Sequence, residues 1–486
     1  MDGSVRDVAA LQARCKEAAD FIQDEAERGT EILVAGHNDA DGLSSIGIVT
    51  GGLLDLGAKF IAKSVFRLEE FIDLMGKRDG GMVILVDMGS GSIHELRKVF
   101  GDRKFVIIDH HQPEAEAIGE NWIHVNPHLF GIDGESEVSA AGVAYLVMRN
   151  ITPNPHIYAP IAVVGSLGDL QDRGEKRKLF GLNEEIVSDA VEGRMLKVYE
   201  DFILYGRGSK PIHQALASTQ SPYLPGLSGE EASCLSLLIE AEIEVRDGDK
   251  WRTIADLTEE EKTKLYNAIV SHLVKNNQPT EVVKDLIGTV YELVNEDVSS
   301  GLRDAREYAQ LLNACGKTNN SWLGVSVAMG YRSWVLEEAQ RVMEQYRTIL
   351  KKSLEFASKN LEQMYNIMVL RVGPEIDVRQ VSSIASILSS SKLIPVDKPL
   401  IVVGQEAGVV KVSARTSSKL VMVGVNLGTV MREAASKFAG RGGGHKIAAG
   451  AEIPADRLTL FLLEVDRLIG EALSRVKTQI TLDDND

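Results

Sequence analysis

The decapeptide KFVIIDHHQP, residues 104–113, decides the fold of this chain. Residues 105–108 are apolar and favour β-structure, so they predict a short buried strand. Asp109, His110 and His111 follow that strand directly. These polar groups are costly to bury without partners, and open α/β sheets bind ligands at the carboxyl ends of their strands. The stretch therefore indicates a functional strand end. A strand end that is only capped and solvated is the alternative, and the neighbouring motifs decide between the two.

Length and composition are those of an ordinary soluble, multidomain protein. The chain has 486 residues, of which 44% are hydrophobic and 25% charged, so about two to four domains are expected. It has no apolar run close to the roughly 20 residues that span a bilayer, and its N-terminal segment lacks the apolar core of a signal peptide. The three cysteines form no CxxC pair, which indicates neither a disulfide framework nor a zinc knuckle. We expect a cytoplasmic protein.

The formal net charge of −17 argues against non-specific binding of polyanions by the whole surface. It leaves room for a nucleic-acid substrate at one site, because bound divalent cations can invert the local field. A cluster of active-site carboxylates would itself contribute to the acidic total.

Short apolar runs alternate with helical patterns through the first part of the chain. Because strands that alternate with helices form βαβ units, and because each run is apolar throughout, we expect a parallel sheet covered on both faces. The expected strands are 31–36, 59–65, 82–86, 105–108 and 122–125, and the expected helices are 43–56, 68–77, 92–100 and 138–149.

Acids and histidines follow several of these strands. His37, Asp39 and Asp41 follow the first, Asp87 follows the third, and the run 161–164 leads into GSLGDLQD, which contains Asp169 and Asp172. The carboxyl ends of parallel strands share one edge, so we expect these groups to converge there. So many carboxylates cannot stay ionised together without cations, and Mn²⁺ or Mg²⁺ suits such oxygen and nitrogen ligands. Two such ions could clamp both oxygens of a phosphoryl displacement.

The remainder divides into a helical middle and a second α/β region. Residues 184–318 are mostly helical in pattern, and residues 333–364 predict one long helix. Strands are expected at 366–372, 400–404, 409–414, 420–425 and 447–453. The glycine-rich GRGGGHK, residues 440–446, lets the backbone approach a phosphate or sugar; a flexible turn is the alternative.

The ordered motifs HNDADG, a strand ending at Asp87, DHH and GSLGD, followed far downstream by GGGH, resemble the DHH phosphoesterase superfamily. More closely they resemble the RecJ-like single-strand exonucleases of archaea, including the GINS-associated nuclease type. The resemblance implies a two-lobed α/β protein: a parallel-sheet DHH domain and a smaller C-terminal α/β domain, joined by a long helix, with a helical insertion. The implied domains are 1–183 (catalytic, with an N-terminal helix), 184–318 (insertion that could dock a partner), 319–365 (connector and long helix) and 366–486 (DHH-associated substrate-binding domain).

The resemblance also implies roles for the residues that match its motifs, with two divalent ions, Mn²⁺ first and Mg²⁺ second, as cofactors. His37 and Asp39 would hold one ion, Asp41 the other, and Asp87 would bridge them. His110 and Asp169 complete the ligands of the second ion. His111 would face the substrate phosphate, and Asp109 would orient the neighbouring imidazole. The expected catalytic residues are thus His111, Asp109 and Asp87.

Substrate contacts are implied in the C-terminal domain. Ser413 and Arg415 match a Ser-x-Arg that reads a terminal phosphate, for which arginine supplies a bidentate fork. Arg441 and His445 would donate to phosphate oxygens beside Gly442, Gly443 and Gly444. Arg67 aligns loosely with another basic contact, and an ordinary surface arginine is the alternative.

The implied function is a two-metal exonuclease that releases mononucleotides from single-stranded DNA or RNA, in DNA replication and repair. Its implied partners are the GINS complex and the replicative helicase, and no membrane. Two alternatives stay open: an oligoribonuclease or other small-substrate phosphoesterase, and a replication scaffold related to the DHH subunit of the eukaryotic replicative helicase. The chain departs from bacterial RecJ in beginning its first motif with His37 rather than an aspartate.

Overall fold

The structure is a computed structural model that describes residues 6–76, 80–117, 119–219, 224–276, 286–374, 376–389, 394–395 and 397–483. It divides into two compact units. The first contains Met1–Ser218 and Glu231–Met343, and the second contains Thr219–Glu230 and Glu344–Asp486. No helix in the described ranges combines the length and apolarity needed to cross a membrane.

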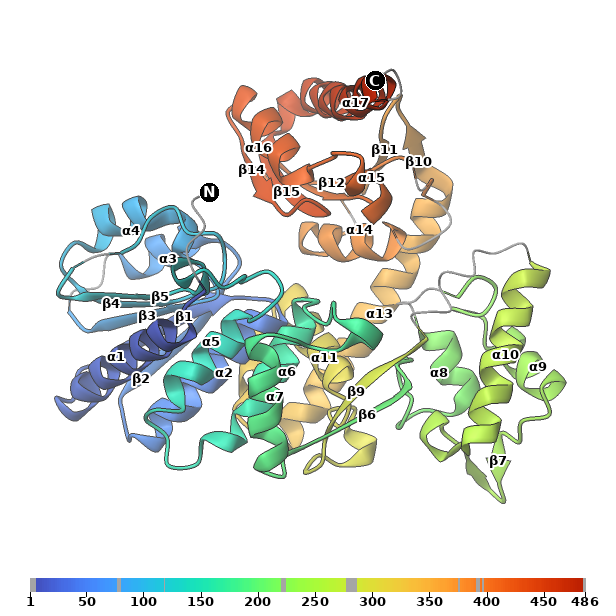
Figure 1. The fold of residues 1–486 in the computed structure, drawn as a ribbon, viewed down its shortest axis with the longest axis horizontal. Coiled ribbons are helices and arrows are strands. Elements are labelled where there is room, and N and C mark those ends of the chain that lie inside the picture. The colour runs from blue at the N-terminus through green and yellow to red at the C-terminus, as the bar shows by residue number, and fades with distance from the viewer. Residues whose placement is uncertain are drawn as a thin grey trace. The chain divides into compact units, whose positions relative to one another are not determined.

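A five-stranded sheet, entirely parallel, forms the centre of the first unit, as predicted (Figure 1). Its order is β2-β1-β3-β4-β5, so the two strands that carry the Asp87 and DHH motifs lie side by side in the middle. The bounds are β1 Ile32–His37, β2 Phe60–Val65, β3 Met82–Val86, β4 Lys104–Ile108 and β5 Trp122–Val125.

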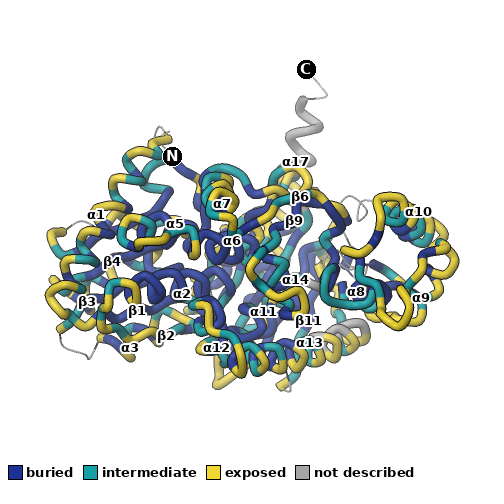
Figure 2. The backbone as a smooth tube through the Cα atoms, turned by 90° about the horizontal axis from the view of Figure 1, so that it is seen from below, coloured by how far each residue is buried: buried dark blue, intermediate teal, exposed yellow. Residues whose placement is uncertain are grey.

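Helices cover both faces of this sheet (Figure 1). On one face, α3 (Leu68–Met75) and α4 (Ile93–Phe100) bury an aromatic cluster in which the rings of Phe105 and Trp122 stack at 4.4 Å. On the other face lie α1 (Val8–Glu27), α2 (Ala40–Asp55) and α5 (Ala140–Met148). Figure 2 shows the resulting buried interior around α2 and α6.

A layer of further helices packs against α2. These are α6 (Ala159–Gly168), α11 (Ala305–Lys317) and α12 (Ser321–Ala328), with α7 (Leu182–Glu192) against α6. The run 161–164 therefore lies inside a helix, and the expectation that Asp169 follows a strand at the sheet edge is wrong. Short apolar runs are compatible with a strand or a buried helix, and here the helix is buried on nearly every side.

The middle of the chain contains a two-stranded antiparallel ribbon of β6 (Leu196–Phe202) and β9 (Ile287–Leu293), which the sequence did not predict. Between them lie α8 (Ile212–Ser218), α9 (Glu231–Glu240), a small hairpin of β7 (Arg246–Asp247) and β8 (Lys250–Trp251), and α10 (Glu259–Lys275). Helices expected in this region thus lie between the two strands of the ribbon in the sequence.

The long helix is α13 (Trp334–Asn360), which begins in the first unit and ends in the second. It is shorter than expected, because Leu361–Gln363 form β10. The sheet of the second unit is mixed, in the order β10-β11-β12-β13-β15-β14. Its other strands are β11 (Met368–Arg371), β12 (Leu400–Glu406), β13 (Val409–Arg415), β14 (Arg441–Gly444) and β15 (Ala448–Pro454), and its helices are α14 (Val381–Ser389), α15 (Ser418–Met422), α16 (Leu427–Lys437) and α17 (Leu458–Asp483).

One expectation for the second unit is wrong, and the structure contradicts one alternative. Residues 420–425 do not form a strand: Ser417 caps the short helix α15, and its side chain accepts from the backbone N–H of Leu420. The glycine run is not a flexible turn either. It forms the edge strand β14, which pairs with β15.

Candidate metal centre

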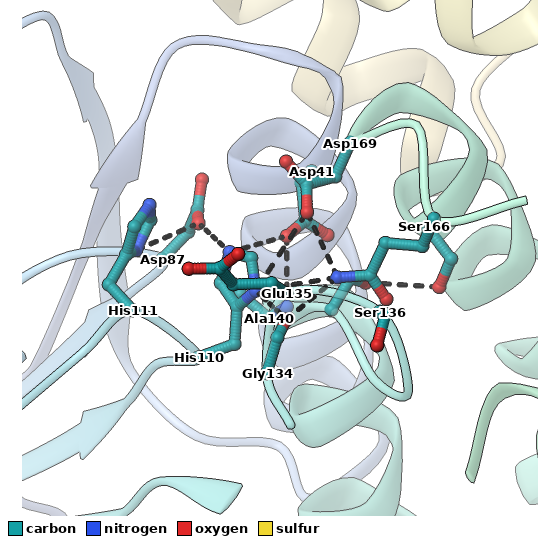
Figure 3. Close-up of polar contacts among 12 residues, drawn as sticks. Asp41, Asp87, His110, His111, Gly134, Glu135, Ser136, Ala140, Ser166 and Asp169 are labelled. Atoms are coloured by element: carbon teal, nitrogen blue, oxygen red, sulfur yellow. Dashed lines mark hydrogen bonds and ion pairs between the residues drawn. The ribbon is translucent and has the colours of Figure 1, made fainter. Parts of the chain in front are cut away.

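The candidate site lies at the carboxyl ends of β1, β3 and β4. His37 is the last residue of β1, Asp87 follows β3, and the Asp109–His111 motif follows β4. Asp87 has a φ of +54°, a conformation that few non-glycine residues adopt and that is found repeatedly at functional sites. Figure 3 shows Asp87, His110 and His111 gathered at this edge, opposite Asp41 and Asp169.

The start of α2 supplies two more carboxylates. Asp39 caps the helix, and its Oδ1 accepts from the backbone N–H of Gly42 at 3.0 Å. Asp41 lies in the first turn, and its two oxygens accept from the backbone N–H groups of Ala140 and Ala141, each at 2.9 Å. These are free amides of the first turn of α5, where a helix favours negative charge. The side chain of Asp41 is therefore fixed from two helices.

Asp169 reaches the site from the end of α6 rather than from a strand. Its Oδ2 accepts from Nε2 of the fully buried Gln171 at 2.9 Å. The same amide nitrogen donates to the carbonyl of Gly134 at 2.9 Å, and Gln171 Oε1 accepts from Asn183 Nδ2 at 2.8 Å. Sequence reasoning missed Gln171 and Asn183, because neutral amides carry no signal of a metal site.

His110 is held by the loop before α5. Its Nδ1 lies 2.7 Å from the carbonyl of Gly134, so Nδ1 carries the proton when the ring is neutral. Nε2 then faces the cluster, 3.7 Å from Asp41 Oδ2 and 3.5 Å from Asp87 Oδ1. A carbonyl that fixes the tautomer of a histidine is a common arrangement behind metal-binding imidazoles.

Three groups of side chains bring their ligand atoms within 4.8 Å of one another. One group is His37, Asp39 and Asp87, a second is Asp41, His110 and Asp169, and a third is Asp87, His110 and His111. The first two together contain all six residues that the sequence assigned to metal ions, and Asp87 is shared between the first and the third. Each group could hold a divalent cation.

The DHH aspartate lies behind this cluster. Asp109 is fully buried, and its Oδ1 lies 2.8 Å from Nδ1 of His111, whose side chain is 48% exposed. Its Oδ2 accepts from the backbone N–H of Ser90 at 2.9 Å, and the hydroxyl of Ser90 contacts His124 Nε2. The contact with Asp109 leaves Nε2 of His111 for a substrate. Sequence reasoning missed Ser90, because nothing in its spacing marks it.

Burial and mutual repulsion raise the pKa values of two carboxylates in this cluster. Burial, followed by the charges of Asp39 and Asp41, raises the pKa of Asp87 well above its usual range. Burial also raises the pKa of Asp41 to about 6, with Asp169 and Asp39 adding to the effect against the attraction of His110. Such crowding disfavours simultaneous ionisation unless positive charge is added.

The pKa values of the two DHH histidines rise as well, and for a histidine this favours the charged form. Burial disfavours the charged form of His110, but the carboxylates of Asp169 and Asp41 outweigh it and raise its pKa to about 9. For His111, burial is likewise outweighed, chiefly by Asp109, and its pKa also rises to about 9. Protons thus supply the positive charge that this donor set needs. Hard carboxylate oxygens with imidazole nitrogens fit Mn²⁺ or Mg²⁺ and would exchange those protons for metal.

Helix α11, which follows the ribbon, contacts the HNDADG motif, residues 37–42. Asn313 on α11 accepts from the backbone N–H of Ala40 at 3.0 Å, and Asn38 donates to the carbonyl of Gly316 at 3.1 Å. A Cβ at Gly316 would lie 1.5 Å from the carbonyl oxygen of Asn38, so this approach requires glycine. Residues 305–317 therefore help to position Asp39 and Asp41.

Asp172 lies outside the cluster. It is buried and forms ion pairs with Arg177 at 3.0 Å and Arg306 at 2.8 Å. Arg306 also donates to the carbonyl of Thr289 on β9 at 2.6 Å. Asp172 thus ties the segment after Asp169 to α11 and to the ribbon.

In the second unit, Ser413 and Arg415 lie at the end of β13. The guanidinium of Arg415 donates to Ser386 Oγ and Ser413 Oγ, both at 3.1 Å, and to the carbonyl of Ala414 at 2.9 Å. These partners, the ones found for it in the described ranges, are all neutral, and burial lowers the pKa of the guanidinium to about 10. A partly buried positive charge without a carboxylate among these partners suits an anionic ligand.

The other expected substrate residues lie in two places, one in each unit. Arg441, Gly442, Gly443 and Gly444 form β14, and His445 follows it. A Cβ at Gly442 would lie 2.3 Å from the carbonyl of Met431 on α16, whereas a Cβ at Gly443 would meet nothing within 4 Å. Packing therefore explains the first of these glycines and not the second. In the first unit, Arg67 precedes α3 at the carboxyl end of β2, and it is half exposed, near Glu70.

Three family models match separate parts of the chain. Residues 31–165 match the DHH family N-terminal domain, residues 204–287 match the DHH-CID domain, and residues 364–471 match the DHHA1 domain. The first match contains the cluster except Asp169. The second corresponds to the segment enclosed by β6 and β9, and the third to the sheet of the second unit.

Related proteins support the same assignment. An uncharacterized protein of Methanocaldococcus jannaschii is 33% identical over 452 residues, which cover 91% of this chain and 94% of that protein. The single-stranded-DNA-specific exonuclease RecJ of Thermus thermophilus is 30% identical over 188 residues, 36% of this chain and only 27% of the relative. The chain thus matches about a quarter of that enzyme's length in sequence.

Solved structures share the fold. RecJ of Thermus thermophilus in complex with Mn²⁺ has a TM-score of 0.58 at 19% identity, covering 94% of this chain and 55% of that chain. CDC45 of Entamoeba histolytica has a TM-score of 0.63 at 13% identity, covering 94% and 99%. With the ordered motifs and the three matching domains, these relationships establish that the chain belongs to the DHH phosphoesterase family, in its RecJ-like branch.

Proposed function

We propose that this protein is a metal-dependent phosphodiesterase that removes mononucleotides from the ends of single-stranded DNA or RNA. The observation that carries the proposal is the convergence of four carboxylates and three imidazoles at one sheet edge, in groups that could each hold a cation. One relative, RecJ of Thermus thermophilus, supports it twice: it is a single-stranded-DNA-specific exonuclease, and its structure is a complex with Mn²⁺.

In this proposal His37, Asp39 and Asp87 hold one divalent ion, and Asp41, His110 and Asp169 hold a second, with Asp87 between them. The geometric support is the close approach of Asp87 to both histidines, 3.9 Å to His37 Nδ1 and 3.5 Å to His110 Nε2. Bound Mn²⁺ or Mg²⁺ would neutralise the phosphate and lower the pKa of the attacking water. The chain contributes the fixed positions of these side chains.

His111 contacts the phosphate in this proposal. Asp109 engages its Nδ1 at 2.8 Å, so Nε2 is the nitrogen that remains for a phosphate oxygen. The raised pKa of His111, about 9, keeps the ring protonated at neutral pH, and a protonated ring can donate to that oxygen. Asp109 orients the ring and is in turn fixed by the N–H of Ser90.

In the second unit we propose that Arg415 and Ser413 bind a phosphate of the substrate, with Arg441, His445 and the glycines of β14 as further contacts. The support is the partly buried guanidinium of Arg415, which has neutral partners in the described part of the chain. Arg67, at the edge that carries the carboxylate cluster, is proposed as a basic contact in the first unit.

The test is a time course of hydrolysis of end-labelled single-stranded DNA and RNA with Mn²⁺, with Mg²⁺ or with a chelator. We expect mononucleotide products that depend on the added metal and disappear with the chelator. A dinucleotide substrate in parallel separates this function from a small-substrate phosphoesterase, which would cleave the dinucleotide at least as well as the long strand. Protein that hydrolyses no phosphodiester with any cation would overturn the proposal.

We further propose that the GINS complex, and with it the replicative helicase, is a partner through the segment 204–287. Deleting residues 184–318 would be a poor test, because it removes α11 and its contacts with the first motif. Phe202 pairs with Ile287 across the ribbon, so a short linker can replace the segment between them. Capture of GINS by the full chain and not by this variant is expected, and equal capture by both contradicts the proposal.

A further inference from the structure

Helix α6 ends in a left-handed turn beside the carboxylate cluster. Asp169 ends the helix, and Leu170 follows with a φ of +57°. The backbone N–H of Leu170 donates to the carbonyl of Leu167 at 3.2 Å, and that of Gln171 donates to the carbonyl of Ser166 at 3.0 Å. This is a common way to end a helix, and glycine usually occupies the left-handed position. Here the turn directs Asp169 to the cluster and Gln171 into the interior.

Folding alone does not explain a leucine at this position. A left-handed conformation is strained for a residue with a Cβ and free for glycine. The side chain of Leu170 is also 60% exposed, so it contributes little to the core. An exposed leucine in a strained position suits a contact with something outside the chain.

Six other helices in the described part of the first unit end with the same pair of hydrogen bonds and provide a comparison. The left-handed position is Gly29 after α1, Gly57 after α2, Arg194 after α7, Glu242 after α9, Asn319 after α11 and Gly330 after α12. Among the described residues, the non-glycine positions with positive φ include no other large aliphatic side chain. An exposed aliphatic residue at such a turn is therefore peculiar to the turn that presents Asp169.

Leu170 directly follows Asp169, and the candidate site has a side that is open to solvent. The side chains of Asp39, His111 and Asp169 are 34%, 48% and 33% exposed, so a ligand can reach the cluster there. Consecutive Cα atoms lie about 3.8 Å apart, which puts Leu170 directly beside Asp169. Nε of the exposed Arg173 donates to the carbonyl of Leu170 at 3.2 Å. An exposed apolar and an exposed cationic side chain thus follow Asp169 within four residues of the chain.

A nucleotide has the matching chemistry, because its phosphate is anionic and its sugar and base present apolar faces. We propose that Leu170 is a substrate-contact residue that packs against the sugar and base of the nucleotide whose phosphate lies at the carboxylate cluster. The contact is tolerant of sequence, since every base has an apolar face. This inference rests on the proposed function and adds a contact to the substrate site.

The test compares Leu170→Gly with Arg194→Gly, which relieves the same backbone strain at the exposed turn after α7. Neither variant is expected to lower the melting temperature. Leu170→Gly should raise KM for single-stranded substrate roughly fivefold, the effect of losing one partly buried aliphatic contact, whereas Arg194→Gly should leave KM unchanged. Leu170→Met, which keeps an apolar side chain of similar length, should restore most of the affinity.

Mn²⁺ provides a readout that does not depend on turnover. The rise in melting temperature on adding Mn²⁺ should be equal in wild type and Leu170→Gly, which shows that Asp169 is still in place. An active wild type with the same KM in Leu170→Gly overturns the substrate contact and leaves the proposed function standing. A smaller Mn²⁺ response in Leu170→Gly also overturns it, because the residue then acts through Asp169. Wild-type protein inert toward nucleic acid overturns both.

Discussion

In the first unit, four carboxylates and three imidazoles share one sheet edge, whereas in the second unit one guanidinium is partly buried among neutral groups. Both arrangements leave charge that the fold itself does not balance. The charge is negative at the carboxylates of the first unit and positive at the guanidinium of the second. Burying unbalanced charge is expensive, so each arrangement indicates a ligand of opposite charge. The first site suits cations and the second suits phosphate. A nuclease needs both, and the predictions below test each side.

The largest effect is expected for Asp87, which belongs to two of the three candidate groups. Asp87→Asn should lower Mn²⁺-dependent hydrolysis by more than about a hundredfold, because groups that only orient metal ligands already account for about 10–100-fold. Asparagine tolerates the left-handed backbone of this position. Initial rates on labelled single strands measure the loss.

Stability separates this effect from misfolding. Asp87 is a buried acid whose ionisation is opposed by burial and by Asp39 and Asp41, so metal-free Asp87→Asn should melt no lower than metal-free wild type. Its melting temperature should respond less to Mn²⁺. Activity within tenfold of wild type would remove Asp87 from its proposed place between the ions.

The second largest effect is expected for Gln171. Its amide donates to Asp169 and to the Gly134 carbonyl, and that carbonyl orients His110. Gln171→Met keeps the size of the side chain and removes these hydrogen bonds. Affinity for Mn²⁺, measured by calorimetry, should fall about 10–100-fold, as for other groups behind metal ligands. Unchanged affinity would mean that Asp169 and His110 need no such support.

The contrast between Asp87 and Gln171 also shows which site residues could be predicted from the sequence and which could not. The strands of the first unit were predictable because each is a continuous apolar run, and Asp87 and the DHH motif were predictable because charged groups follow those runs directly. Asp169 was assigned correctly to the cluster's neighbourhood for a wrong reason, since the run before it is the buried helix α6.

The supporting residues could not be predicted in the same way. Gln171 meets Gly134 and Asn183 only after three separate segments have folded together. The contacts of Asn313 and Gly316 with the first motif join residues more than 270 positions apart. Neutral amides and glycines occur throughout the sequence, and no local spacing distinguishes those that will lie behind a charged cluster. These long-range hydrogen bonds could therefore be identified only from the structure.

A third prediction concerns pH. His110 must lose a proton to ligate a metal through Nε2, and its pKa is raised to about 9. Between about pH 6.5 and pH 8.5 the apparent association constant for Mn²⁺ should therefore rise at least about tenfold per pH unit, because His110 releases one proton and Asp87, whose pKa is also raised, releases another where it is protonated. Below pH 6 the dependence should steepen, because Asp41, with a pKa raised to about 6, is then protonated too. Calorimetry in buffers of different ionisation enthalpy counts the protons released, and a flat profile would contradict this account.

On the second unit, Arg415→Met tests the partly buried positive charge. A charged hydrogen bond to phosphate is worth about 1.5–3 kcal/mol, so the preference for a strand with a terminal phosphate over one without it should fall by about tenfold or more. Because the guanidinium has neutral partners in the described ranges, the variant leaves no unpaired carboxylate behind and should fold. Unchanged discrimination would mean that the terminal phosphate is bound elsewhere.

The smallest effect separates packing from binding within one strand. A Cβ at Gly442 would collide with the carbonyl of Met431, and a Cβ at Gly443 would meet open space. Gly442→Ala should therefore lower the melting temperature of the protein, and Gly443→Ala should not. If the substrate backbone approaches β14, the methyl group at position 443 will raise KM a few-fold at unchanged stability, because only the absence of a Cβ permits close approach of a ligand. A Gly443→Ala variant with the KM of wild type would remove Gly443 from the proposed phosphate site of the second unit, and packing against α16 would then explain Gly442 alone.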